Sequence, residues 1–193
     1  MPYAESAVRV LIATVFLVAA AGKVSSRRSF TAFTASLGQL NVLPGTVIRA
    51  VAVAVVATEW LVCSLVLMPW ASLAGVGLAL AAVLLVVFAA VIARVVARGT
   101  RAVCRCFGSG SREPLGVRHV VRNLLLAGFA ASAAGTTLLR EAAPAEPWAL
   151  ALSALAGLLV GGCVAAFDVV AELFRPVGPA HSPPSGSPLQ PGR

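Results

Sequence analysis

The sequence contains few charged residues for its length. Only 11% of its 193 residues are charged and 59% are hydrophobic, whereas a soluble domain has about 25% charged and roughly 45–50% apolar residues. So few charges cannot cover a surface that faces water, which excludes an ordinary globular enzyme. Acidic side chains are the scarcest, because seven Asp and Glu stand against fifteen Lys and Arg, and the net charge is +8.

Other absences exclude further classes of protein. Aromatic residues make up only 6% of the chain and do not alternate with the arginines, as a base-stacking surface would require, so we predict no nucleic-acid binding. No Walker, Rossmann or haem-attachment pattern occurs, and we predict no cofactor. The cysteines have only His119 nearby as a further ligand, which is too few for a metal site.

Long uncharged stretches predict a membrane protein with five spans. Residues 50–93 hold a single charge, Glu59, in 44 positions, enough for two helices of about 20 residues. We predict spans near 7–23, 47–68, 70–93, 119–139 and 148–170. Their small residues allow helices to approach closely. The predicted fold class is therefore all-α, an integral membrane helical bundle.

The distribution of basic residues predicts the orientation of these spans. Five uncleaved spans place thirteen Lys and Arg on one face and two, Arg9 and Arg140, on the other. The positive-inside rule then makes the rich face cytoplasmic, with the N-terminus outside and the C-terminus and the 94–118 loop inside. The alternative is a signal peptide cleaved after the AAAG that precedes Lys23. Cleavage would place the face rich in Lys and Arg outside.

Two segments lie outside the predicted spans. In residues 26–41, Phe30, Phe33 and Leu37 recur at helical spacing behind two arginines, which favours a helix in the cytoplasmic interface over an exposed linker. Residues 176–193 contain six prolines in 18 positions. That composition cannot form a packed core, so we predict a disordered tail.

Two cysteines stand one residue apart in the arginine-rich loop. Cys104 and Cys106 can form a disulfide if the backbone bends, and so small a ring would be strained and readily reduced. Arg101, Arg105 and Arg112 would favour the thiolate. The pattern suits thiol–disulfide exchange, although chance spacing and inert reduced thiols remain open alternatives on spacing alone. No other catalytic motif is present.

A few polar or reactive side chains lie inside the predicted spans. Glu59 is about 18 Å from the span end at 1.5 Å per residue. It is either a functional group, neutral unless a cation reaches it, or a protonated interhelical hydrogen-bond donor. Cys63 and Cys163 are expected to be buried among apolar helices and not to pair. Arg122 can reach the phosphates, and Asn123 can hydrogen-bond between helices.

These motifs together resemble the MauE family of bacterial membrane proteins, which is related to the DoxX-like four-helix proteins. The resemblance rests on Gly22-Lys23, Glu59, Cys104-Arg105-Cys106-Phe107-Gly108 and the run from Arg118 to Leu124. It covers roughly residues 7–139. We therefore predict a MauE-like membrane domain over 1–139, followed by an additional span at 148–170.

The resemblance implies a role in methylamine utilisation, in the processing, transport or maturation of an exported disulfide-containing subunit. Carried over by position, Cys104 and Cys106 would be the redox pair, supported by Lys23, Glu59, Arg105, Arg122 and Asn123. The implied partners are the bilayer, a thioredoxin-like protein and an exported client.

Disulfide maturation of an exported subunit occurs outside the cytoplasm, whereas the charge count places these cysteines inside. Either the pair draws electrons from a cytoplasmic thioredoxin, or the loop arginines are present for the cysteine chemistry and do not indicate that the loop is cytoplasmic. The rival hypothesis is a non-catalytic assembly factor or small-solute carrier centred on Glu59.

Overall fold

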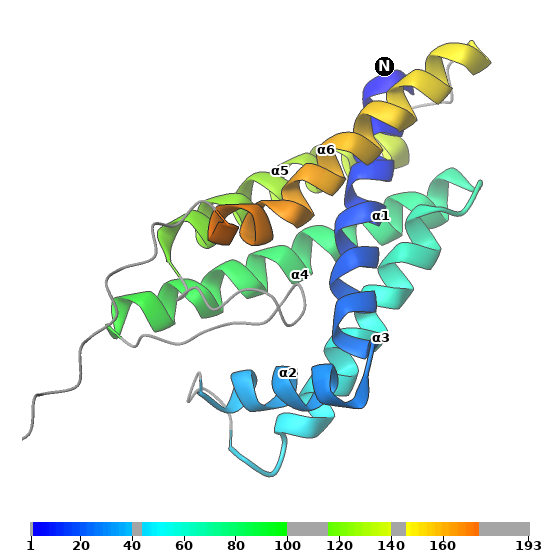
Figure 1. The fold of residues 1–193 in the computed structure, drawn as a ribbon. Helices are drawn as coiled ribbons and strands as arrows, with labels where there is room; N and C mark the ends of the chain where they lie inside the picture. The colour runs from blue at the N-terminus through cyan, green and yellow to red at the C-terminus, as the bar shows by residue number, and fades with distance from the viewer. Residues whose placement is uncertain (1, 40–43, 100–115, 140–145, 174–193) are drawn as a thin grey trace, which may run out of the picture.

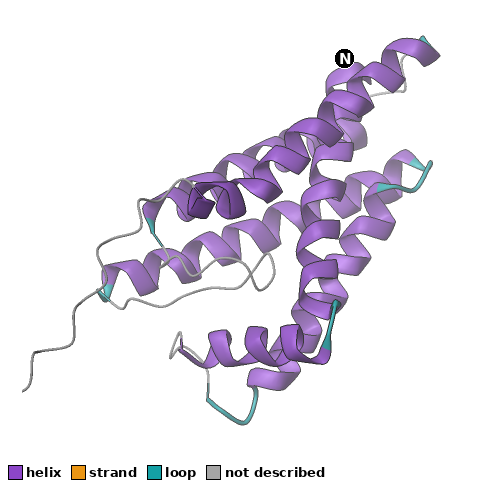
Figure 2. Ribbon diagram, in the orientation of Figure 1, coloured by secondary structure: helices purple, strands orange, loops and turns teal. Residues whose placement is uncertain are grey.

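The computed structural model describes residues 2–39, 44–99, 116–139 and 146–173, and every element in these ranges is a helix (Figures 1 and 2). Their bounds are α1 Pro2–Val24, α2 Arg27–Gln39, α3 Ile48–Val66, α4 Ala71–Ala97, α5 Val117–Leu139 and α6 Pro147–Leu173. The all-α prediction is confirmed. The C-terminal tail, 176–193, lies outside the described residues.

Each of the five predicted spans corresponds to a helix. Within the described residues, four helices are long and apolar enough to cross a membrane: α1, α3, α4 and the Pro147–Ala166 part of α6. The fifth, α5, has 23 residues but is less apolar, because Arg118, Arg122 and Asn123 occupy its first two turns. These helices form the bundle of a multi-pass membrane protein.

The helices pack as pairs around a common apolar core. In Figure 1, α4 and α5 run side by side and cross the α1–α3 pair. The core draws on α1, α3, α4 and α5, and many of its side chains are small, such as Ala81, Ala130 and Ala134. Small residues allow the backbones to approach closely, which is how helices associate in a bilayer.

The helix α6 packs on α1 and on no other helix in the described part of the chain. Two glycines four residues apart make the contact. A Cβ at Gly157 would overlap the carbonyl oxygen of Ala7, and one at Gly161 would lie 3.0 Å from the carbonyl oxygen of Leu11. This is the small-xxx-small packing of membrane helices, and it joins the additional C-terminal helix to the first span.

The short helix α2 lies across one end of the bundle (Figure 1). Its start is capped by Ser26, whose Oγ accepts a hydrogen bond from the Ser29 amide at 3.0 Å, the usual N-cap geometry. Its apolar side chains pack inward: Phe33 contacts α3 around Ala52 and Val56, and Leu37 reaches the end of α4. The predicted helix within 26–41 is thus confirmed.

The two ends of the bundle differ in composition. At one end Arg9 of α1 meets the end of α3, and the Glu146 amide, just before α6, donates to the Tyr3 hydroxyl. This aromatic end exposes Tyr3, Trp70 and Trp148, residues typical of membrane interfaces. The opposite, basic end exposes Arg27, Arg28, Arg49, Arg94, Arg98 and Arg118.

Candidate functional site: a buried ion pair at three helices

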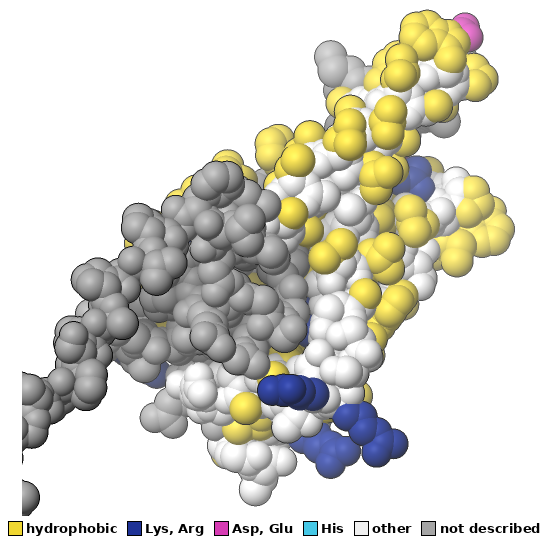
Figure 3. Space-filling view, viewed as in Figure 1, with side chains coloured by type: hydrophobic (Ala, Val, Ile, Leu, Met, Phe, Trp, Pro, Cys, Tyr) yellow, Lys and Arg dark blue, Asp and Glu magenta, His cyan; other side chains and the backbone are white. Residues whose placement is uncertain are grey.

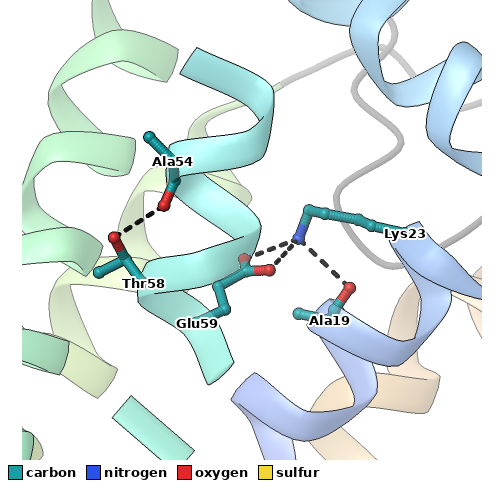
Figure 4. Close-up of polar contacts among 5 residues, drawn as sticks. All are labelled: Ala19, Lys23, Ala54, Thr58 and Glu59. Carbon is teal, nitrogen blue, oxygen red and sulfur yellow. Dashed lines mark hydrogen bonds and ion pairs between the residues drawn. The ribbon is translucent and has the colours of Figure 1, made fainter. Parts of the chain in front are cut away.

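Lys23 and Glu59 form an ion pair in the interior of the protein. The Lys23 Nζ donates to Glu59 Oε1 at 2.7 Å and to Oε2 at 3.0 Å, and both residues are at most 2% exposed. A third hydrogen bond from Nζ reaches the Ala19 carbonyl oxygen at 3.3 Å. Figure 4 shows the ammonium placed between the carboxylate and that carbonyl.

Three helices position these side chains. Lys23 lies in the last turn of α1 and Glu59 lies near the middle of α3. From α2, the Phe33 ring lies 5.2 Å from the Lys23 Nζ, which is a cation–π distance. Because Phe33 is itself only 2% exposed, the ammonium is shielded from solvent on this side by an aromatic face. The ion pair therefore joins α1, α2 and α3.

Each charge of this pair is stable in the protein interior only because the other lies beside it. Two opposite charges that leave water together are tolerated when they are close and hydrogen-bonded, whereas removing one partner leaves an uncompensated buried charge. The sequence predicts that Glu59 is neutral unless a cation reaches it. Lys23 is that cation, at 2.7 Å from the carboxylate. The interhelical bond runs to Lys23 and not to a hydroxyl or a backbone carbonyl.

The described cysteines occupy two different environments, and neither is in a disulfide. Cys63 lies one turn after Glu59 on α3, is 5% exposed, and has its Sγ 3.7 Å from the Ala13 carbonyl oxygen. Cys163 is exposed on the surface of α6, so its predicted burial among helices is wrong. The reason is that, among the described helices, α6 packs only on α1, and Cys163 is not on that contact face.

The remaining predicted site residues are divided between α5 and the undescribed loop. Asn123 is buried on α5 and Arg122 is partly buried. Cys104, Arg105 and Cys106 lie outside the described residues. The helices on either side of that loop meet in a small apolar cluster. Val120 of α5 and Leu37 of α2 both pack against Ile92 and Val95 near the end of α4.

Sequence reasoning missed two residues of this structure. Arg9 donates to the carbonyl oxygens of Val66 and Met68, its Nη2 at 3.0 and 2.6 Å, and so satisfies orphan carbonyls at the end of α3. The signal was available, since Arg9 is a lone charge inside the first span. Phe33 was identified as an apolar position, but nothing in the sequence pointed to its contact with Lys23.

Comparison with known proteins supports the resemblance described above. The family model of the methylamine utilisation protein MauE matches residues 1–138. The methylamine utilization protein MauE of Paracoccus denitrificans is 37% identical over 153 residues, which is 78% of this chain and 78% of that protein. No solved structure matches. The match includes α1 to α4 and nearly all of α5, hence the ion pair and the cysteine loop, and the chain belongs to the MauE family of membrane proteins.

Proposed function

We propose that this protein is a membrane-bound thiol–disulfide accessory in methylamine utilisation, acting in the maturation of an exported disulfide-containing protein. The observation that carries the proposal is the pair Cys104 and Cys106, one residue apart in an arginine-rich loop between α4 and α5. The similarity to a methylamine utilization protein supports the pathway. The arginines favour the chemistry, because nearby positive charge stabilises the thiolate, which is the attacking species.

The proposed exchange transfers two electrons and conserves every sulfur. One loop thiolate attacks a disulfide sulfur of the client, forming a mixed disulfide and releasing one client thiolate, which takes up a proton. The second loop cysteine loses its proton and attacks the mixed disulfide, which releases the second client thiol and leaves Cys104 and Cys106 joined. A dithiol of thioredoxin type then reduces the loop disulfide and becomes oxidised itself.

The buried ion pair has a supporting role in this proposal. Lys23, Glu59 and Phe33 fix α2 against α1 and α3, and Leu37 of α2 in turn packs against the end of α4. The ion pair would therefore hold the base from which the loop departs. A solute carrier centred on Glu59 is less well supported, because Glu59 is 1% exposed and a solute would have to displace Lys23.

Replacing both loop cysteines tests the proposal. The double variant Cys104→Ser, Cys106→Ser should insert and fold as the wild type does, because neither residue belongs to a predicted span. Maturation of the client, measured as the fraction with its native disulfide pairing in a strain that lacks the native gene, should fall to the level of that strain, because non-native client disulfides would no longer be reduced. Retained maturation would refute the redox role and favour a non-catalytic assembly factor.

Two single cysteine variants serve as matched controls for this experiment. Cys163→Ser changes an exposed thiol on α6, and Cys63→Ala changes a buried thiol in the core. Both should keep client maturation near the wild-type level. Loss of maturation in either control at normal protein levels would mean that the loop pair does not act alone.

We also propose that the N-terminus faces outward and that the loop and the C-terminus are cytoplasmic, so that the loop cysteines would exchange with the client before it is exported. The excess of basic residues at the basic end supports this orientation. Reporter fusions after Arg112 and after Arg193 should both report a cytoplasmic location. A fusion at Arg112 that reports the outer side would reverse the orientation and place the cysteines where an exported client folds.

A further inference from the structure

Three arginines surround α2 at the basic end of the bundle. Arg27 and Arg28 form its first turn, and Arg49 lies in the first turn of α3; all three are exposed. Arg49 lies close to the other end of α2, because a Cβ on Gly38 would be 3.4 Å from the Ile48 side chain. Figure 3 shows basic side chains gathered at this lower end of the molecule. We call these three residues the basic platform.

The packing of α2 fixes the platform in place. Phe33 is 2% exposed and contacts α3, and its ring faces the Lys23 ammonium. The apolar side of α2 is therefore occupied by the protein, and its arginines lie on the outer side. The platform is at the end of helices long enough to span a bilayer, so a bilayer crossed by these helices would have its lipid headgroups at this level.

The described carboxylates do not neutralise the platform. Among the side chains that the structure describes there are three: Glu5, Glu59 and Glu146. Glu59 is buried and bound to Lys23. Glu5 is in the first turn of α1 and Glu146 precedes α6, so both belong to the aromatic end. None of the carboxylates that the structure describes therefore lies beside these arginines, which leaves their charge available to an anion from outside the described part of the chain.

We propose that the basic platform binds the headgroups of anionic phospholipids. Its width favours a membrane surface over a single small anion, because α2 has 13 residues and extends about 20 Å at 1.5 Å per residue. One phosphate cannot bridge arginines at both ends of such a helix, whereas neighbouring headgroups of one leaflet can. A basic residue near an anionic surface contributes about 1 kcal/mol, a preference of about fivefold per arginine.

Lipid selectivity of the reconstituted full-length chain tests this proposal. The protein is placed in phosphatidylcholine vesicles with spin-labelled phosphatidylglycerol or spin-labelled phosphatidylcholine, and electron paramagnetic resonance measures the motionally restricted fraction of each. We expect a several-fold preference for phosphatidylglycerol that weakens with added salt. The variant Arg27→Gln, Arg28→Gln, Arg49→Gln should lose at least half of that preference.

A charge-preserving variant and a competing anion make the test specific. The variant Arg27→Lys, Arg28→Lys, Arg49→Lys should keep most of the preference, because the positive charge is retained. Equal selectivity in the glutamine variant and the wild type would overturn the proposal. Inorganic phosphate that abolishes the preference at millimolar concentration, where chloride of the same ionic strength does not, would identify a soluble phosphate site and also overturn it.

Discussion

Replacing Lys23 with methionine should lower the stability of the folded protein by about 3–5 kcal/mol, the range measured when one partner of a buried ion pair is removed. The Glu59 carboxylate would then be left without a cation in a site that is 1% exposed. Glu59→Leu should have a similar effect on Lys23. The loss can be measured as a shift in the unfolding midpoint of the purified protein in detergent.

The double variant Lys23→Met, Glu59→Leu distinguishes a lost charge pair from lost packing. Removing both charges together leaves nothing unpaired, so most of the stability should return. Thr58→Val is a matched control on the same helix, because the Thr58 hydroxyl donates only to Ala54 in its own helix, at 2.8 Å (Figure 4). A double variant as unstable as either single variant would contradict the account of the ion pair.

Glu59→Lys should prevent stable insertion of α3. A lysine near the centre of a span costs about 2.5–3.5 kcal/mol on insertion scales, and here it would also face the ammonium of Lys23, which now lies 2.7 Å from the Glu59 carboxylate. We expect the membrane-integrated protein, measured by membrane fractionation and carbonate extraction, to fall several-fold below the wild type.

Exchanging the two charges provides the control for this variant. In the variant Lys23→Glu, Glu59→Lys, opposite charges again lie near each other, so part of the lost insertion should be recovered. Recovery is expected to be incomplete, because the Ala19 carbonyl accepts from Lys23 at present and would face a carboxylate instead. Equal insertion of Glu59→Lys and the wild type would indicate that Glu59 faces water.

The helices could be predicted from the sequence because their signal is local. Runs without charge are long enough to span a bilayer, and the five predicted spans match α1, α3, α4, α5 and α6 to within a few residues at most ends. The largest difference is at the start of α1, which begins at Pro2. Polar residues such as Glu5 do not prevent a helix from continuing beyond the apolar segment.

The ion pair could be predicted only in part. Glu59 was conspicuous because it is the single charge in 44 residues. Lys23 was not, since a lysine at the end of a span normally marks the membrane surface, and only the family resemblance pointed to it. The two residues are 36 positions apart in the sequence, and their contact depends on how α1 and α3 pack, which periodicity does not specify.

Exposure within a span was the least predictable property. An apolar helix can be covered by other helices or by lipid, and its composition is similar in both cases. This is why Cys163 was expected to be buried, whereas it lies on the surface of α6. The glycines at 157 and 161 mark the side of α6 that packs on α1, so their positions would have been the better guide.

The redox state of the loop cysteines in growing cells tests the central claim most directly. In a Cys63→Ala, Cys163→Ala background only Cys104 and Cys106 remain, and differential alkylation followed by mass spectrometry gives the fraction joined as a disulfide. We predict that this fraction rises when the client is overproduced and falls when the thioredoxin-type donor is overproduced. A pair that stays fully reduced, or fully oxidised, under both conditions would contradict the proposed exchange.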